Sequence, residues 1–331
     1  MNNELNKLAL AVNTATVEES KEAKIVAIGG GKGGGGKTFT CETMGTALVD
    51  LGYSVLIVDL DQQRTCVFWW NRRVDFVEAE LAEIESRRGS IEQMLEDVKV
   101  ISGISMARHK LEKDIERYYQ LIKMKNLIVV DIDISVQEKM NAIVGRNGGL
   151  ETEEFYRLDA LKKAGEMYDW FDFRNLINDE IENFDYILID TPGHLDNVSL
   201  QENVMGICDL AVFPTKTTLV DMEQMPRNKE LTISIKKKYD LDFKAVSVVL
   251  VKDKSNNKYN DYSLLSDVAD TLPVLSLDGV DTVLALRTSG LKANEVGCTA
   301  IEFGNDKDEQ ESIRRFGRAI VATLNNELEG N

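Results

Sequence analysis

One glycine-rich stretch constrains the fold of this 331-residue chain more than any other segment. Residues 29–38 read GGGKGGGGKT, follow an apolar run at 25–28, and precede a segment with helical periodicity at 39–49. Glycines between a buried strand and a helix let successive backbone amides turn inward, and the helix N-terminus adds partial positive charge. The stretch therefore predicts a phosphate-binding loop, because residues 31–38 also fit G-x-x-x-x-G-K-[ST].

The residues of this loop have separate expected roles. We expect Lys37 to reach the terminal phosphates of a nucleotide and the Thr38 hydroxyl to hold Mg²⁺. A second lysine, Lys32, lies inside the loop, where most phosphate loops do not require one. The nucleotide-binding set that we predict is Gly31, Gly33, Gly34, Gly35, Gly36, Lys37, Thr38 and Phe39. The alternative, a flexible glycine-rich turn, is disfavoured by the strand before it and the helix after it.

Aspartates follow two further apolar runs. Asp59 and Asp61 come after the run at 54–58, and Asp190 comes after the run at 186–189. Ligands of open α/β sheets bind outside the carboxyl ends of the strands, so these aspartates are expected near the phosphate loop. Asp190 has the Walker B pattern of a carboxylate that holds Mg²⁺. Asp61 is a candidate to orient or deprotonate water, although Asp59 and Asp61 could simply cap the next turn.

Strands and helices alternate along most of the chain. This alternation predicts an α/β, doubly wound, mostly parallel sheet with helices on both faces, the P-loop NTPase fold, with a largely helical insertion. A last amphipathic helix is expected at about 309–328. The remaining strands are expected at 127–132, 210–213, 245–251 and 273–275.

The expected domain organisation is simple. Residues 1–22 are polar and form a tail, and 23–331 form the P-loop domain. The helical insertion covers about 72–180, because the span from Asp61 to Asp190 is long for one crossover; helices are expected within it at about 153–168 and 173–183.

Composition limits the class of protein. The net charge of −17 argues against a protein that coats DNA with its whole surface, so a DNA contact requires a local basic patch. A basic protein partner, in contrast, would be attracted by the negative charge of the chain.

Four cysteines lie far apart without a C-x-x-C pair, which indicates free thiols in a reducing compartment. No apolar run approaches the ~18 residues of a membrane span, and no secretory signal is visible, so a cytoplasmic location is expected.

Three motifs together resemble the ParA/MinD family of deviant Walker A ATPases. Residues 32–38, KGGGGKT, are similar to the family pattern K-G-G-x-G-K-T-[TS], and residues 59–63, DLDQQ, resemble its switch I segment D-x-D-P-Q. Residues 187–192 resemble its Walker B segment, and residues 287–295 loosely resemble its late motif. The resemblance covers about 24–70 and 184–330, and its best match is to ParA-type plasmid partition ATPases.

This resemblance implies an ATPase that uses ATP and Mg²⁺ and forms an ATP-dependent sandwich homodimer. Its catalytic residues would be Lys32, Lys37 and Asp61, with Lys32 reaching the partner subunit's nucleotide and Asp61 positioning water. The metal site would comprise Thr38, Asp59 and Asp190. Two residues depart from the family: Phe39 replaces a hydroxyl residue and Gln62 replaces a proline.

The expected partners depend on whether the chain belongs to the MinD-like or the ParA-like branch of the family. The acidic C-terminus lacks the apolar face of a MinD-like membrane helix, so no membrane binding is expected. ParA-like members bind nonspecific DNA and a ParB-like activating partner, here expected to be basic, and would associate with the nucleoid. The candidate DNA-binding residues are Arg314, Arg315 and Arg318.

Two alternatives remain open. The chain could be a nucleotide-gated adaptor, a MinD-like positioning factor that binds a protein and no DNA. A GTPase is the other, because Asp190–His194 also matches D-x-x-G-H, but the N-K-x-D guanine motif fails at Asn260.

Overall fold

The computed structural model describes residues 23–30, 34–61, 63–100, 106–131, 184–192, 204–216, 223–252, 272–286, 288–303 and 306–325. The predicted tail at 1–22 and the predicted helices at 153–168 and 173–183 lie outside these residues.

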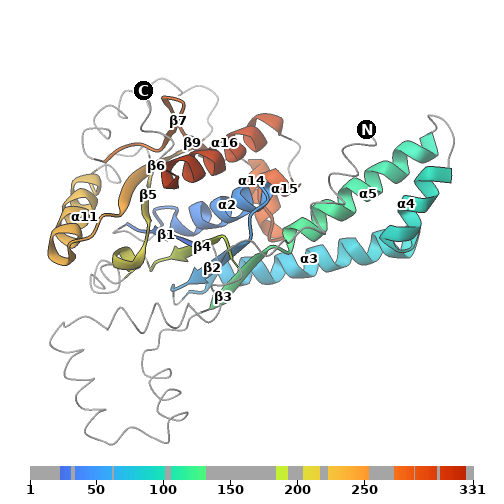
Figure 1. The fold of residues 1–331 in the computed structure, drawn as a ribbon, viewed down its shortest axis with the longest axis horizontal. Helices are drawn as coiled ribbons and strands as arrows, with labels where there is room; N and C mark the ends of the chain where they lie inside the picture. The colour runs from blue at the N-terminus through green and yellow to red at the C-terminus, as the bar shows by residue number, and fades with distance from the viewer. Residues whose placement is uncertain are drawn as a thin grey trace, which may run out of the picture.

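A parallel sheet forms the centre of the protein (Figure 1). Within the described ranges it has seven strands in the order β3-β2-β4-β1-β5-β6-β9, and every neighbouring pair is parallel. The predicted fold class is therefore confirmed, and the carboxyl ends of all these strands lie along one edge. The strands are β1 (Lys24–Ile28), β2 (Val55–Asp59), β3 (Leu127–Asp131), β4 (Tyr186–Asp190), β5 (Leu210–Lys216), β6 (Lys244–Lys252) and β9 (Val283–Leu286).

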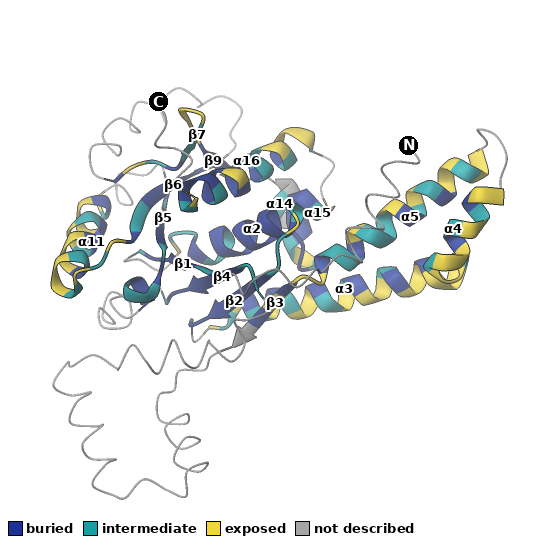
Figure 2. Cartoon of the chain, in the orientation of Figure 1, coloured by how far each residue is buried: buried dark blue, intermediate teal, exposed yellow. Residues whose placement is uncertain are grey.

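The strands of the sheet are largely buried (Figure 2), and an apolar core covers each face. Successive residues of a strand point to opposite faces, so Val26 packs in a core with residues of α2 (Lys37–Asp50) and α16 (Lys307–Leu324). Its neighbour Ala27 packs in a second core with α11 (Met225–Tyr239). This two-sided burial explains why the strands read as continuous apolar runs.

Three helices form a long projection that we call the arm: α3 (Thr65–Arg88), α4 (Ile91–Val100) and α5 (Met106–Met124). Figure 1 shows the arm leaving the sheet beyond β3. Its helices share an apolar core that includes Val77, Met94 and Ile115. The largely helical character expected of the insertion is confirmed in its described part before β3, although α3 begins at Thr65, ahead of the expected start at about 72. The bounds of the insertion stay a prediction, and β3 confirms the strand expected at 127–132.

The region before the last helix differs from expectation. The strand expected at 273–275 is reduced to one bridge, Val274 with Ser247, while a hairpin of β7 (Ser276–Leu277) and β8 (Val280–Asp281) leads into β9. Asp278 and Gly279 turn this hairpin with φ of 54° and 69°, and an Asp-Gly pair is a hairpin signal that the sequence contained.

Short helices complete the fold. They are α14 (Thr288–Glu295) and α15 (Ala300–Phe303), and α16 follows. Helix α16 starts two residues before the expected position 309, because the Asp306 carboxylate accepts hydrogen bonds from the amides of Asp308 and Glu309. In the described part of the chain, no helix has the length and apolar character needed to cross a membrane.

Candidate nucleotide-binding site

The loop before α2 has a backbone that favours glycine. Gly34 and Gly36 have φ of 76° and 95°, in the left-handed region. A Cβ at position 36 would also lie 2.3 Å from Cδ1 of Leu250 on β6. Gly36 is the N-cap of α2 and has no side chain to pair with the first-turn amides, which leaves them for an anion. The predicted loop residues Gly31, Lys32 and Gly33 lie outside the described residues.

Lys37 and Thr38 open α2 and lie beside the carboxyl end of β4. The Thr38 hydroxyl donates a hydrogen bond to Oδ2 of Asp190 at 2.7 Å. Lys37 is buried, and burial lowers the pKa of its ammonium group, while the charges of Asp190 and Asp61 raise it. The structure therefore brings together the side chains of Lys37, Thr38 and Asp190 with those of Asp61, whose charge acts on Lys37, and Asp59, which pairs in register with Asp190.

Asp190 is the residue best suited to hold Mg²⁺. Its side chain is buried at the end of β4, and burial raises its pKa to about 7. Its Oδ1 atom is buried and has no hydrogen-bond partner among the described residues. Mg²⁺ prefers oxygen ligands and keeps several waters and phosphate oxygens, so an unpartnered carboxylate oxygen beside the Thr38 hydroxyl fits this ion.

Asp59 and Asp61 organise the turn between β2 and α3. Asp59 accepts hydrogen bonds from the amides of Asp61 at 3.0 Å and Val67 at 3.2 Å, and Asp61 accepts one from the amide of Gln63 at 3.0 Å. Both aspartates therefore cap backbone amides of this turn, as the alternative interpretation of the sequence expected. Asp59 is fully buried, and burial raises its pKa; its role at the metal stays a prediction.

Two side chains at the site were missed by sequence reasoning. The Cys66 thiol, in the first turn of α3, donates to Oδ2 of Asp190 at 3.4 Å, and its pKa is raised well above the usual range by a hydrogen bond with Cys41 and by burial. The ammonium group of Lys216, at the end of β5, donates to the carbonyl oxygen of Gly34 in the phosphate loop. Neither contact has a sequence motif, because both depend on which strands are neighbours.

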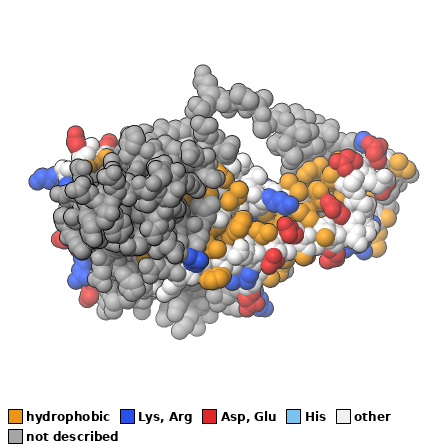
Figure 3. Space-filling model, turned by 90° about the horizontal axis from the view of Figure 1, so that it is seen from below, with side chains coloured by type: hydrophobic (Ala, Val, Ile, Leu, Met, Phe, Trp, Pro, Cys, Tyr) orange, Lys and Arg blue, Asp and Glu red, His pale blue; other side chains and the backbone are white. Residues whose placement is uncertain are grey.

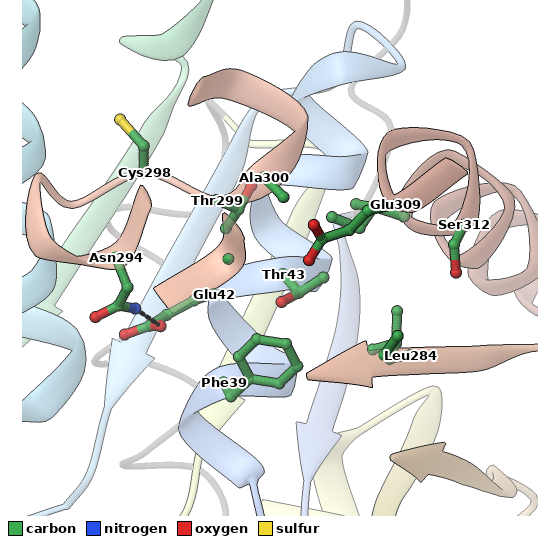
Figure 4. A pocket seen from close by; sticks show the side chains of 13 residues that line it. Phe39, Glu42, Thr43, Leu284, Asn294, Cys298, Thr299, Ala300, Glu309 and Ser312 are labelled. Carbon is green, nitrogen blue, oxygen red and sulfur yellow. Dashed lines mark hydrogen bonds between the residues drawn. The ribbon is translucent and has the colours of Figure 1, made fainter. Parts of the chain in front are cut away.

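Phe39 lines a small cavity between α2, β9, α14 and α16 (Figure 4). The cavity measures about 20 Å³, enough for roughly one water molecule, so it is too small for a nucleobase. Beside it, Asn294 donates to the buried Glu42 carboxylate at 2.9 Å. Burial raises the Glu42 pKa well above its usual range. Nucleotide binding by Phe39 stays a prediction.

The three arginines predicted to bind DNA lie on α16 and contact the protein itself. Arg314 forms an ion pair with Asp50 at 3.0 Å, and Arg318 pairs with Glu311 at 2.5 Å. Arg315 donates to the carbonyl oxygens of Leu277 and Val280. The structure thus shows internal contacts for all three side chains, and their contact with DNA stays a prediction.

The parallel sheet, the glycine loop before α2 and the Asp190–Thr38 pair define a P-loop nucleotide-binding protein. The chain belongs to the AAA_31 family, described as an AAA domain, whose family model matches residues 23–244. The resemblance to ParA/MinD-type ATPases predicted from the motifs is confirmed by this match and by the fold.

Solved structures with the same fold are distant in sequence. An ATP complex of an McdA variant from Cyanothece has a TM-score of 0.56 at 16% identity, covering 91% of this chain and 97% of that chain. Apo McdA from Cyanothece has a TM-score of 0.54 at 16% identity, covering 90% and 99%. Cobyrinic acid a,c-diamide synthase from Mycobacterium smegmatis has a TM-score of 0.50 at 16% identity, covering 93% and 96%. No curated protein matches the chain.

Proposed function

We propose that this protein is an ATP-dependent switch of the ParA type, which hydrolyses ATP slowly until a partner stimulates it. In this proposal it dimerises on ATP, binds nonspecific DNA in that state, and so positions or segregates plasmid DNA or similar cargo. The single observation that carries the nucleotide part is the 2.7 Å contact of Thr38 with Asp190, made beside Lys37 and Asp61. That arrangement supports phosphoryl transfer, in which positioning and charge stabilisation provide most of the catalysis.

Each site residue has a role in this chemistry. The loop amides and Lys37 would bind the phosphates and stabilise the charge that develops on the transferring group. Asp61 would align the attacking water, and Lys32 would add positive charge from the other subunit of the dimer. Thr38 and Asp190 would hold Mg²⁺, with Asp59 nearby, and the bound ion would neutralise phosphate charge. Burial of Lys37 excludes water and strengthens its attraction to phosphate.

Two observations favour ATP over GTP. An McdA variant of the same fold was solved in a complex described as containing ATP. The N-K-x-D guanine motif is also incomplete here, because its last position is Asn260.

Hydrolysis measurements test this part of the proposal. The chain should release phosphate from ATP in the presence of Mg²⁺, and Lys37→Ala should abolish both ATP binding and hydrolysis. An exposed arm lysine, Lys110→Ala, serves as the matched control and should leave both unchanged. A clear preference for GTP would reject the assignment.

The adaptor function is the second candidate, and the arm favours it. Hydrophobic side chains lie exposed along the arm among charged ones (Figure 3), and at its tip Val100 is 80% and Met106 is 89% exposed. Exposed apolar residues on a projecting element are typical of a protein-binding surface. The internal contacts of the α16 arginines also reduce the positive charge offered to DNA. In this version the chain would bind a protein and no DNA.

DNA binding distinguishes the two candidates. Binding to a random-sequence duplex would be measured with ATP, ADP or no nucleotide, at two salt concentrations. The ParA-type proposal expects binding only with ATP, falling with salt by a slope of about 0.9 per phosphate neutralised. Arg318 is the exposed one of the three α16 arginines, so it is the best placed to contact a phosphate. Arg318→Ala should therefore lower the salt slope by about 0.9, the value for one phosphate contact. The absence of binding even at low salt would leave the adaptor as the better description, whereas ATP-independent binding would reject the ATP-gated DNA binding of the first candidate and the adaptor alike.

A further inference from the structure

Strand β5 extends beyond its neighbour β1 at the edge of the sheet where the phosphate loop begins. β1 ends at Ile28, which pairs with Val212, whereas β5 continues to Lys216 along β6. The last four residues of β5 therefore run beside the loop that leaves β1. On the side away from β6, this part of β5 lies past the end of β1 and can contact the loop.

Lys216 uses this position to reach the phosphate loop. Leu210 and Val212 belong to the core on the α2 face, and alternation along β5 places Lys216 on that same face. Lys216 pairs in register with Leu250, the residue that packs under Gly36. Leu250 thus supports the loop from β6, while the Lys216 ammonium group donates to the Gly34 carbonyl oxygen from β5.

The charges at the site create a need for this lysine. Among the described residues of the site, the charges of Asp61 and Asp190 act on the cation of Lys37, and Asp59 lies beside Asp190 on the neighbouring strand. A bound nucleoside triphosphate adds several negative charges to this acidic edge. In a single subunit, the ammonium group of Lys37 and one divalent ion do not balance that charge before Lys32 of a second copy arrives, so a further cation beside the loop would strengthen binding.

We propose that Lys216 is a nucleotide-binding residue, a cation supplied by the same subunit to the phosphates held in the loop. This inference rests on the proposed function. An ammonium group has three donors, so Lys216 can keep its bond to the Gly34 carbonyl and still donate to a phosphate oxygen. It differs from Lys37, which is buried, in being partly exposed.

Three substitutions at Lys216 test the proposal by equilibrium binding of Mg²⁺-ATP, measured by calorimetry. Lys216→Gln retains a donor for the Gly34 carbonyl and removes the charge, and Lys216→Met removes both. Each should raise the dissociation constant for ATP about tenfold, the size expected for one charge-assisted hydrogen bond. Lys216→Arg retains the charge and should bind within about twofold of the unsubstituted chain, since a phosphate accepts either cation.

The controls separate the possible failures. Lys110→Gln, on the exposed surface of α5, should not change ATP binding. Unfolding by urea should show equal stability for all variants, because Lys216 is partly exposed. ATP binding by Lys216→Gln equal to that of the unsubstituted chain would overturn this inference alone, as would equal weakening in Lys216→Arg. An unsubstituted chain that does not bind ATP would overturn the proposed function, and this inference with it.

Discussion

Asp61 has a partly buried carboxylate, one oxygen of which is bound to the loop. Its Oδ1 accepts the amide of Gln63, and its charge acts on the ammonium group of Lys37. A carboxylate that is held in place by a backbone amide, close to the phosphate-binding lysine, is suited to orient a water molecule. Asp59 is less suited, because the turn and the start of α3 already use both of its oxygens.

We therefore expect Asp61→Asn to bind ATP normally and to lose turnover by about 10²–10⁴-fold, the usual contribution of a general base. Asparagine keeps an oxygen for the Gln63 amide, so the loop should remain folded. Single-turnover phosphate release and ATP binding would be measured on the same sample. Hydrolysis at the normal rate would remove Asp61 from the mechanism, and Lys110→Asn provides an exposed control.

Glu42 makes the stability of the protein depend on pH. Its pKa in the folded protein is raised well above the ordinary value of 4.5, chiefly by burial. The folded state therefore holds a proton that the unfolded state has already released. Its contribution to stability is complete below pH 4.5 and is lost as pH rises through the folded-state pKa.

Between pH 4.5 and the folded-state pKa, Glu42 should make the free energy of unfolding fall by up to about 1.4 kcal/mol per pH unit, the value for one proton. Glu42→Gln should remove this pH dependence. Glutamine retains an oxygen that accepts from Asn294, so the local packing should be kept. Because glutamine does not ionise, the variant should gain stability relative to the unsubstituted protein as the pH rises from 5 to 8. Urea unfolding across this range measures the effect. Glu295→Gln, exposed on α14, is the control, and an unchanged slope in Glu42→Gln would show that Glu42 titrates normally.

Single residues of the site could be predicted from the sequence where they belong to a recognisable motif. The positions of Lys37, Thr38 and Asp190 followed from the loop pattern and the strand ends, because those patterns fix the backbone around them. Cys66 and Lys216 were not predictable, since their contacts with Asp190 and Gly34 require the strand order.

At the scale of elements, the end of α14 packs directly on α3 at the base of the arm. Gly297 has φ of 72°, and a Cβ there would lie 2.2 Å from the Arg73 amide nitrogen and 2.4 Å from the Trp69 carbonyl oxygen. The buried Arg73 guanidinium pairs with Glu302 of α15, with Nη1 to Oε2 at 2.6 Å, and donates to the carbonyl of Met124 in α5. These contacts join the arm to the segment that follows β9.

Gly297→Ala should accordingly destabilise the protein more than Gly279→Ala. Both positions have positive φ, near 70°, so each alanine costs about 1–2 kcal/mol of backbone strain. Gly279 faces open space, whereas Gly297 adds an overpacking cost of about 1–3 kcal/mol. Urea unfolding of the two variants isolates the packing term, and equal losses would mean that the α14–α3 approach is looser than the structure indicates.

Elements were predicted well where their apolar pattern was long. The two-sided burial of β1, β2 and β4 produced clear runs, and the arm helices had clear three- and four-residue spacing. β9 was missed because four residues after a hairpin carry too little pattern, and its place in the sheet comes from pairing with β6.

At the scale of the whole molecule, charge opposes the proposed assembly of two copies. Each chain has a net charge of −17, so two chains repel one another at long range. Salt at 0.15 M reduces this repulsion to within about 8 Å. Binding of an anionic DNA by local basic residues has the opposite dependence, because salt competes for the phosphates.

Dimerisation and DNA binding should therefore respond to salt in opposite directions. With ATP and the Asp61→Asn substitution to prevent turnover, light scattering should detect dimers whose dissociation constant falls as salt rises from 50 to 200 mM, about the range over which DNA affinity drops steeply. ADP is the control and should leave monomers at both concentrations. A dimer that weakens with salt would mean that its interface depends on complementary charges strong enough to outweigh the net repulsion of the two chains, and an ATP-independent dimer would exclude the switch.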